Sequence, residues 1–357
     1  FFEKSFMDPF SQAALGAVVA QASAQHKLGV RVVAVGAMAG AMPDIDVFFA
    51  EDYFHNLQIH RGITHSLFFA PVMGPILGYL IYKYECHRSN DLINKERMRY
   101  WMLAMFLALL SHPLLDVLTP YGTQLLLPFT DQRFALFAMP IIDPLYTMPL
   151  FIGIYLAWRY RQKAQVHLIG ITFLVVTTSY LVYGWYLGQA AKREAELQLV
   201  NLGLQDFQVE SFPTFLQLHY RRVVARTPTA DWVGYISMWR PCEIEWGMAE
   251  QTPRSDFDEV SDMREVRIFE WFAMGWLHRT VIEQDGNTTY QYADLRYGLV
   301  TNPKDSFFSL NVTDTNQGFQ WDTQNPISNS GEINQRLNSL FSSAYPGTCE
   351  RPPLVYF

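Results

Sequence analysis

Four long apolar stretches in the first half of the chain constrain its fold more than any other feature. Each has about the 17–25 residues that a helix needs to cross the hydrocarbon core of a bilayer. Two weaker stretches rich in Gly, Ala and Val precede them, and small residues allow helices to pack closely in lipid. We therefore expect a polytopic α-helical membrane domain of about six segments. The strong stretches cover residues 66–82, 100–118, 140–158 and 166–188, and the weak ones 10–25 and 28–43.

The charges divide the chain into two parts of different character. Residues up to 190 contain 13 Lys and Arg against 12 Asp and Glu, whereas the rest contains 14 against 22. The net charge of −7 therefore comes from the second part. An acidic chain without a basic patch argues against nucleic-acid binding.

The second part has the patterns of a soluble α+β domain. Residues 216–226 and 232–239 alternate between apolar and polar side chains, which is typical of half-buried strands. Residues 265–276 indicate a helix packed on that sheet. We predict a membrane domain over residues 7–190 and a soluble domain over 191–357.

The positive charges predict the orientation of the membrane domain. Loops 83–99 and 159–165 are rich in Lys and Arg, and such loops stay in the cytoplasm. The soluble domain would then be periplasmic, in a multi-pass protein of the bacterial inner membrane. In that oxidising compartment Cys242 and Cys349 could form a disulfide.

The same topology brings a set of ionisable side chains to the outer ends of the predicted helices. A charged residue inside a membrane helix costs about 2.5–3.5 kcal/mol on insertion scales, so such residues indicate a function. They come from the stretches MPDID, HRGITHSL, SHPLLD and IIDPLY, and they are Asp44, Asp46, His60, His65, His112, Asp116 and Asp143.

His112 and Asp116 are the most specific pair in this set. They are four residues apart and therefore share one face of a helix. An imidazole nitrogen and a carboxylate at this spacing can hold one cation. The alternative is a His–Asp hydrogen bond that braces the helix turn broken by Pro113.

The other acidic and histidine candidates are interpreted in two ways. Asp44 and Asp46 follow Pro43 and are either metal ligands or a solvated helix end. His65 directly precedes a membrane helix, so we expect it to be a ligand. His60 lies further out and would face the substrate, and we expect His60, Asp46 and Asp116 to act in catalysis.

Asp143 and two arginines complete the candidate site. Asp143 precedes Pro144 and either caps a helix or contributes a further metal ligand. Arg61 and Arg133 could hold a phosphate, because a guanidinium group binds phosphate through two parallel hydrogen bonds. Ordinary surface arginines are the alternative.

A mixed His/Asp set suits zinc, and also manganese or iron. Such a site with an open position activates water for hydrolysis. Phosphoesters are the anionic groups at a lipid surface, so we expect a metal-dependent phosphoesterase that acts on a lipid or lipid-linked substrate. A metal or ion transporter with the same ligands, and a non-catalytic scaffold whose tail binds a protein partner, are the alternatives.

Five ordered motifs of the first part resemble those of a known family. They resemble the YdjM-type family of bacterial inner-membrane proteins, described as metal-dependent hydrolases, over residues 7–190. The tail resembles the C-terminal extension of longer members, with DLRYG at 294–298. The motifs are MDPFSQAALGA, GAMAGAMPDIDV, HRGITHSL, SHPLLDVLTPYGTQLL and IIDPLYTMPL.

That family looks distantly similar to the zinc-dependent phospholipase C and P1 nuclease group. The resemblance implies one to three zinc ions, with His112 as a ligand and Asp116 bridging two metals. It also implies that His65, with Asp46 or Asp44, completes the first metal site. Many family members carry His where this chain has Gln12, which is a poorer ligand.

Overall fold

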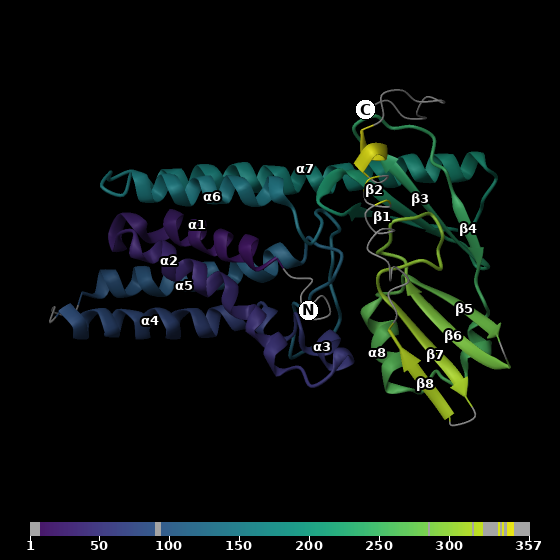
Figure 1. Ribbon diagram of the computed structural model, residues 1–357. Coiled ribbons are helices and arrows are strands. Elements are labelled where there is room, and N and C mark those ends of the chain that lie inside the picture. The colour runs from purple at the N-terminus through teal and green to yellow at the C-terminus, as the bar shows by residue number, and fades with distance from the viewer. Residues whose placement is uncertain are drawn as a thin grey trace. The chain divides into compact units, whose positions relative to one another are not determined.

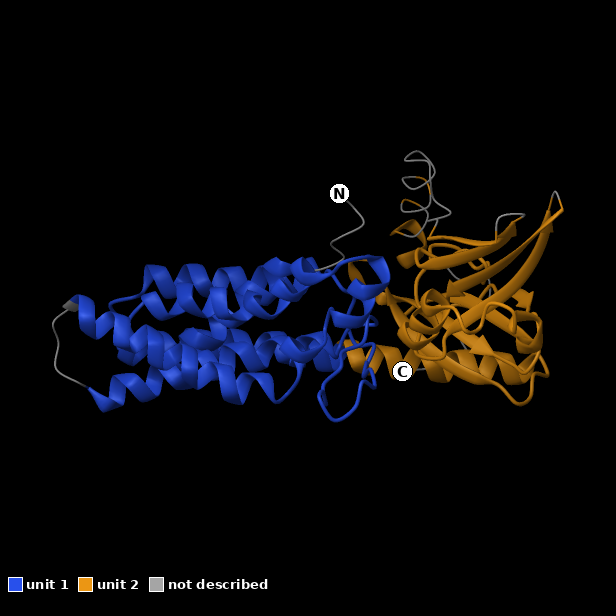
Figure 2. Ribbon diagram, turned by 90° about the horizontal axis from the view of Figure 1, so that it is seen from below, with its two compact units in different colours: residues 1–183 blue, residues 184–357 orange. Residues whose placement is uncertain are grey.

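The structure is a computed structural model in which two compact units are distinguished, residues 1–183 and residues 184–357 (Figure 2). The boundary falls within the long helix α7 (Val166–Asn201), close to the domain boundary predicted at residue 190. The residues described are 8–89, 94–284, 286–315, 318–323, 335, 338 and 341–345.

The first unit is a bundle of helices that run side by side (Figure 1). α1 and α2 form the predicted hairpin, and α2 continues directly into a 3-10 helix, η2. A short helix and a second 3-10 turn then connect this hairpin to α4. The helices are α1 (Pro9–Leu28), α2 (Arg31–Ala41), η2 (Met42–Phe49), α3 (Tyr53–Ile59), η3 (Ile63–His65), α4 (Phe69–Ser89), α5 (Lys95–Asp116) and α6 (Pro144–Arg159).

Three helices in the described residues are long and apolar enough to cross a membrane, rather than the six predicted. They are Arg31–Phe49, which joins α2 and η2, together with α5 and α7. A fourth candidate is a pair bent by 64°, Tyr53–His65 and Phe69–Arg88. α6 has only 16 residues, because the chain becomes helical only at Pro144. α1 is long enough but carries several buried glutamines, so it contributes a polar core helix rather than a clear span.

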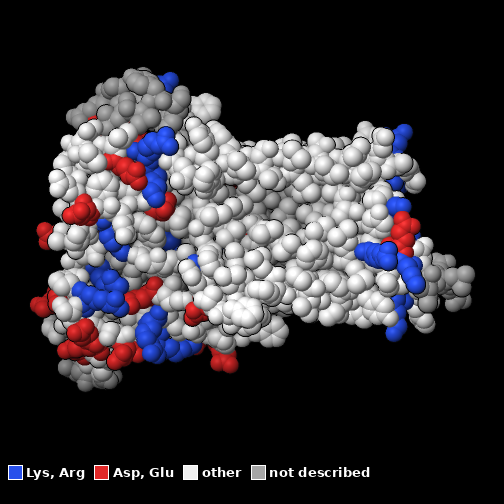
Figure 3. Space-filling view, turned by 180° about the vertical axis from the view of Figure 1, so that it is seen from behind, with Lys and Arg blue, Asp and Glu red and all other residues white. Residues whose placement is uncertain are grey.

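The turns that connect the long helices lie at one end of the first unit. Lys27 at the end of α1 forms an ion pair of 2.7 Å with Glu96 at the start of α5. The ring of His26 lies 4.7 Å from that of His167 at the start of α7. Figure 3 shows Lys and Arg gathered at this end and an uncharged band along the helices. The basic turns therefore share one end, as predicted, and the candidate site residues lie at the other.

Glycines allow α1 and α2 to pack against each other without intervening side chains. A Cβ atom on Gly16 would lie 2.7 Å from Gly40 Cα, and one on Gly36 would lie 2.6 Å from the Gly16 carbonyl oxygen. Gly36 and Gly40 are four residues apart, the spacing at which small residues form a close helix contact in lipid. This contact confirms the predicted hairpin and places the end of α2 beside α5.

The second unit contains two four-stranded antiparallel sheets. The strands follow one another in sequence order within each sheet, and α8 (Arg264–Phe272) lies between them in the chain. Two strands and a helix lie where they were predicted, although the helix ends at Phe272 rather than at residue 276. The first sheet comprises β1 (Gln208–Thr214), β2 (Gln217–Arg226), β3 (Ala230–Ser237) and β4 (Gly247–Glu250), and the second comprises β5 (Leu277–Gln284), β6 (Asn287–Asp294), β7 (Ser309–Thr315) and β8 (Gly318–Asp322).

The last turns of α7 form a hydrophobic core with the first sheet. Ala191, Ala195 and Leu199 are buried against Val223 of β2 and Ile236 of β3. The residues of α7 after Tyr183 therefore belong to the second unit. Before this point α7 exposes apolar side chains, and after it one apolar face is buried against the sheet.

Polar groups and one disulfide also stabilise the second unit. Arg222 of β2 donates hydrogen bonds to the carbonyls of Leu295 and Val300, which ties the first sheet to the segment after β6. Burial lowers the pKa of its neighbour Arg221 to about 9. Cys242 is disulfide-bonded, whereas Cys86 is free. The predicted partner of Cys242, Cys349, lies outside the described residues.

Replacing the glycine at the centre of the α1–α2 contact tests this packing. We expect Gly36→Val to lower the free energy of unfolding by about 1–3 kcal/mol, because the added methyl groups would overlap the backbone of α1. The control is Ala34→Val, on the exposed face of the same helix. Thermal unfolding in detergent measures both, and equal melting temperatures for the two variants would contradict the close contact.

Candidate metal centre

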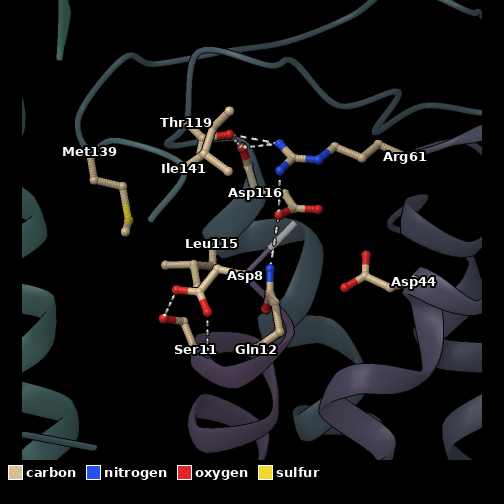
Figure 4. Close-up of a pocket in the computed structure, with 10 residues that line it drawn as sticks. All are labelled: Asp8, Ser11, Gln12, Asp44, Arg61, Leu115, Asp116, Thr119, Met139 and Ile141. Carbon is tan, nitrogen blue, oxygen red and sulfur yellow. Dashed lines mark hydrogen bonds and ion pairs between the residues drawn. The ribbon is translucent and has the colours of Figure 1, made fainter. Parts of the chain in front are cut away.

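The candidate site lies at the end of the first unit that is opposite the basic turns. The start of α1, the helix η2, the segment around η3 and the end of α5 meet there, together with the loop between α5 and α6. Figure 4 shows Asp44, Arg61 and Asp116 approaching from three of these segments. Segments far apart in the sequence thus meet at one place.

Local backbone features fix the two segments that carry most of the ligands. Pro43 stands at the start of η2, whose tighter turns follow the end of α2. Arg61 has φ of +61°, a left-handed conformation that is uncommon for a residue with a side chain. A Cβ atom on Gly62 would lie 2.6 Å from the carbonyl oxygen of Ile59, so the turn requires glycine there. Such strain is typical of segments that position functional groups.

Four side-chain atoms converge at the centre of the site. His65 Nε2 lies 2.9 Å from His112 Nε2, and both lie within 3.3 Å of Asp44 Oδ1. Asp116 Oδ2 lies 3.3 Å from His65 Nε2 and 3.4 Å from His112 Nε2. His65 and His112 are fully buried and the Asp116 side chain is nearly so. The predicted pair His112 and Asp116 is therefore joined by His65 and Asp44.

Five separations between these atoms are close to those between neighbouring ligands of a small tetrahedral ion. The possible ligand groups place Asp116 with His65 and His112, and Asp44 with His60 and His65. With metal–ligand bonds of about 2.0–2.1 Å, tetrahedral ligand atoms lie about 3.3 Å apart. The five separations above run from 2.9 to 3.4 Å. Two imidazole nitrogens and two carboxylate oxygens also form a donor set that zinc accepts. The residues present therefore fit a divalent metal ion.

The second nitrogen of each of these imidazoles is held by the protein. His112 Nδ1 donates a hydrogen bond of 2.6 Å to the Gly40 carbonyl oxygen. His65 Nδ1 lies 3.0 Å from Thr64 Oγ1 and 3.3 Å from Asp46 Oδ2. Metal-binding histidines usually make such a contact, which fixes the ring and leaves Nε2 for the metal.

Asp46 contacts His65 at Nδ1, the nitrogen that faces away from the other ligand candidates. Its Oδ2 accepts hydrogen bonds from the Arg61 amide at 3.2 Å and from Thr64 Oγ1 at 3.0 Å, and its Oδ1 lies 3.0 Å from His60 Nδ1. Both oxygens are therefore engaged, and the structure places Asp46 as a support for two histidines rather than in either ligand group. His60, Asp44 and His65 form a second group of possible ligands that overlaps the first.

Arg61 contacts a ligand instead of projecting freely towards a substrate. Its side chain is buried and forms an ion pair of 3.2 Å with Asp116 Oδ1. It also donates to Thr119 Oγ1 at 2.7 Å, and its guanidinium group lies over the Tyr121 ring. Arg61 also lines the small cavity beside the cluster, and its role as a phosphate clamp stays a prediction.

Arg133 and Asp143 occupy structural positions near the site. Arg133 is buried and donates to the carbonyl oxygens of Leu57, Tyr121 and Gly122, so it fastens the loop after α5. Asp143 Oδ1 accepts the amides of Leu145 and Tyr146 as the cap of α6, and its Oδ2 accepts from Tyr180. Among the described residues, Asp143 belongs to neither group of possible metal ligands.

A small cavity beside the cluster is lined by the predicted site residues Asp44, Arg61 and Asp116 together with other polar residues. Its volume is about 20 Å³, enough for about one water molecule. Gln12 from α1 lines it and donates a hydrogen bond of 2.8 Å to Asp116 Oδ1. Asp8 and Thr119 line it too (Figure 4). Asp8 also caps α1, because Ser11 N donates to its carboxylate. The only sequence signal for its place at the cavity was that Asp8 belongs to the first family-like motif, MDPFSQAALGA.

Comparison with known proteins identifies the family. Residues 7–190 match the model of the YdjM inner membrane protein family, over half of the chain. The chain belongs to that family. The predicted family is thereby confirmed, and the family and the apolar helices together indicate a membrane protein. The distant similarity to phospholipase C and P1 nuclease stays a prediction.

This YdjM-family chain is also similar to the uncharacterized protein YfhP of Bacillus subtilis (strain 168). The two are 28% identical over 209 residues, which cover 57% of this chain and 58% of YfhP. The chain thus matches little more than half the length of that relative. No solved structure matches the chain.

Substitution of Asp46 tests whether this residue supports the histidines of the candidate metal centre without itself binding the metal. We expect Asp46→Asn to weaken metal binding by about 10–100-fold, the usual effect of losing a carboxylate behind a ligand histidine. His112→Ala, which removes a ligand, should bind no metal at this site. Zinc titration of purified protein measures both, with Glu51→Gln, an exposed acid, as the control. Unchanged affinity in Asp46→Asn would refute the supporting role.

Proposed function

We propose that this protein is a membrane-bound metal-dependent hydrolase that cleaves a phosphoester of a lipid or lipid-linked substrate. The observation that supports it most is the convergence of His65 Nε2, His112 Nε2, Asp44 Oδ1 and Asp116 Oδ2 within 2.9 to 3.4 Å for the five measured pairs. Histidines held in this way by Gly40 and Asp46 are prepared to bind a metal rather than only each other.

Zinc fits this donor set best, and manganese or iron would also accept it. His65, His112, Asp44 and Asp116 would hold the ion. When bound, a divalent ion supplies Lewis-acid chemistry that activates water and offsets the charge developing on a phosphoryl group.

The remaining residues of the site would position water and substrate. The cavity beside Asp116 has room for about one water molecule, and Gln12 and Asp8 provide polar contacts there. Asp46 holds His60 Nδ1, which leaves His60 Nε2 as the atom that can accept a hydrogen bond from water. Arg61 keeps a positive charge next to Asp116, where an anionic substrate would arrive.

The place of the cluster in the bundle supports an enzyme over a transporter. Transport sites usually lie near the middle of the membrane on interrupted helices. Here the ligands come from the last turn of α5 and from segments that follow α2 and precede α4. The basic turns at the other end favour a periplasmic position for the cluster and for the second unit.

Substitution of the ligands tests the enzyme proposal. We expect His65→Ala, His112→Ala and Asp116→Ala each to lose bound zinc together with hydrolysis of a phospholipid or a generic phosphodiester. His87→Ala is the matched control, because this histidine is exposed at the opposite end of the bundle. Metal analysis and a phosphate-release assay on the same preparations give the result. A metal-containing wild type without activity on any phosphoester would reject the reaction but not the metal site.

Arrangement in the membrane is tested separately by cysteine labelling in intact cells. In a Cys86→Ala background, we expect an impermeant maleimide to label Ser255→Cys, in an exposed segment of the second unit. His87→Cys, at the end of α4, should react only after the membrane is permeabilised. Labelling of His87→Cys in intact cells would reverse the proposed orientation.

A further inference from the structure

An apolar groove lies directly beside the candidate metal centre. Its volume is about 540 Å³, within the roughly 300–1,000 Å³ usual for sites that bind small molecules. Ile45 and Phe49 of η2 form one side, and Ile63, Phe69 and Leu127 contribute to the rest. The groove is thus built from the same segments that carry Asp44 and His65.

Asp46 and Thr64 connect this groove to the metal centre. Both line the groove. Both also contact His65 Nδ1, Thr64 at 3.0 Å and Asp46 at 3.3 Å. One side chain, of Asp46 or Thr64, therefore separates a molecule in the groove from His65.

The side chains around the groove remain exposed although they are apolar. Ile45 is 47% exposed, Ile63 54% and Phe49 71%, and Phe48 beside them is 83% exposed. A continuous apolar surface of this kind marks a site of interaction rather than a solvated end. Since η2 ends a candidate membrane span, the hydrocarbon available at this depth is that of bilayer lipids.

We propose that this groove binds a fatty acyl chain of a membrane phospholipid, with the phosphate of that lipid placed at the His/Asp cluster. The second part of this statement rests on the proposed hydrolase function, whereas the binding of the chain does not. The juxtaposition explains why a polar, buried cluster lies next to an apolar groove. It assigns the preferred substrate to amphiphiles with a linear chain next to the phosphate.

Photo-cross-linking of the full-length protein in nanodiscs tests the groove. The probe is phosphatidylglycerol with a diazirine in one acyl chain, and labelled peptides are mapped by mass spectrometry. We expect wild-type protein to be labelled more strongly within residues 42–69 than on the exposed apolar surface of α7. Ile63→Trp and Ile45→Trp should each reduce that label by about tenfold, the change that displacing roughly two methylene groups would cause.

Val176→Trp is the matched control, because Val176 lies on α7 with 50% exposure, close to the exposure of Ile63. It should leave the label in the groove unchanged. His112→Ala should also keep this label, so that a failure of the metal-dependent reaction is distinguished from a failure of the groove. Labelling spread equally over α7 and residues 42–69, or unaffected by both groove variants, would overturn the proposal.

Discussion

Burial of negative charge at the end of an apolar bundle is the constraint on which the rest of the first unit depends. The side chains of Asp44, Asp46 and Asp116 are at most 12% exposed, and buried carboxylates are costly unless they are paired. Arg61 provides one fixed positive charge, through Asp116. The two histidines face the other carboxylate oxygens, so a cation between them would complete the compensation.

Close helix packing supplies the precision that such a site needs. The glycine contact of α1 with α2 brings the Gly40 carbonyl oxygen to His112 Nδ1, which orients the ring. The same contact brings Gln12 of α1 to Asp116. A cluster built on packed helices is more rigid than one on loops alone. The strained turn at Arg61 is held by a hydrogen bond that its backbone N–H donates to Asp46 Oδ2. The helix contacts that stabilise the bundle therefore also set the geometry of the site.

Local patterns in the sequence predicted the residues at the centre of the site but not the contacts of the residues around it. The spacing of His112 and Asp116 predicted their shared face, and the position of His65 before a helix predicted that it lies with them, as the structure shows. Arg61, Arg133 and Asp143 were harder, because each also has a partner more than 30 positions away in the chain, such as Tyr180 for Asp143. Of the six predicted spans, three or four are found among the described residues by length and composition, and neither α1 nor α6 is among them.

X-ray absorption at the zinc edge on detergent-purified protein tests the central claim most directly. Our account predicts stoichiometric zinc whose nearest neighbours are nitrogen and oxygen atoms at about 2.0–2.1 Å, with the outer-shell scattering of two imidazoles. Substitution of Asp44 and Asp116 together should remove that signal. A spectrum without imidazole scattering, or zinc bound through sulfur, would contradict the assignment of His65 and His112 as ligands.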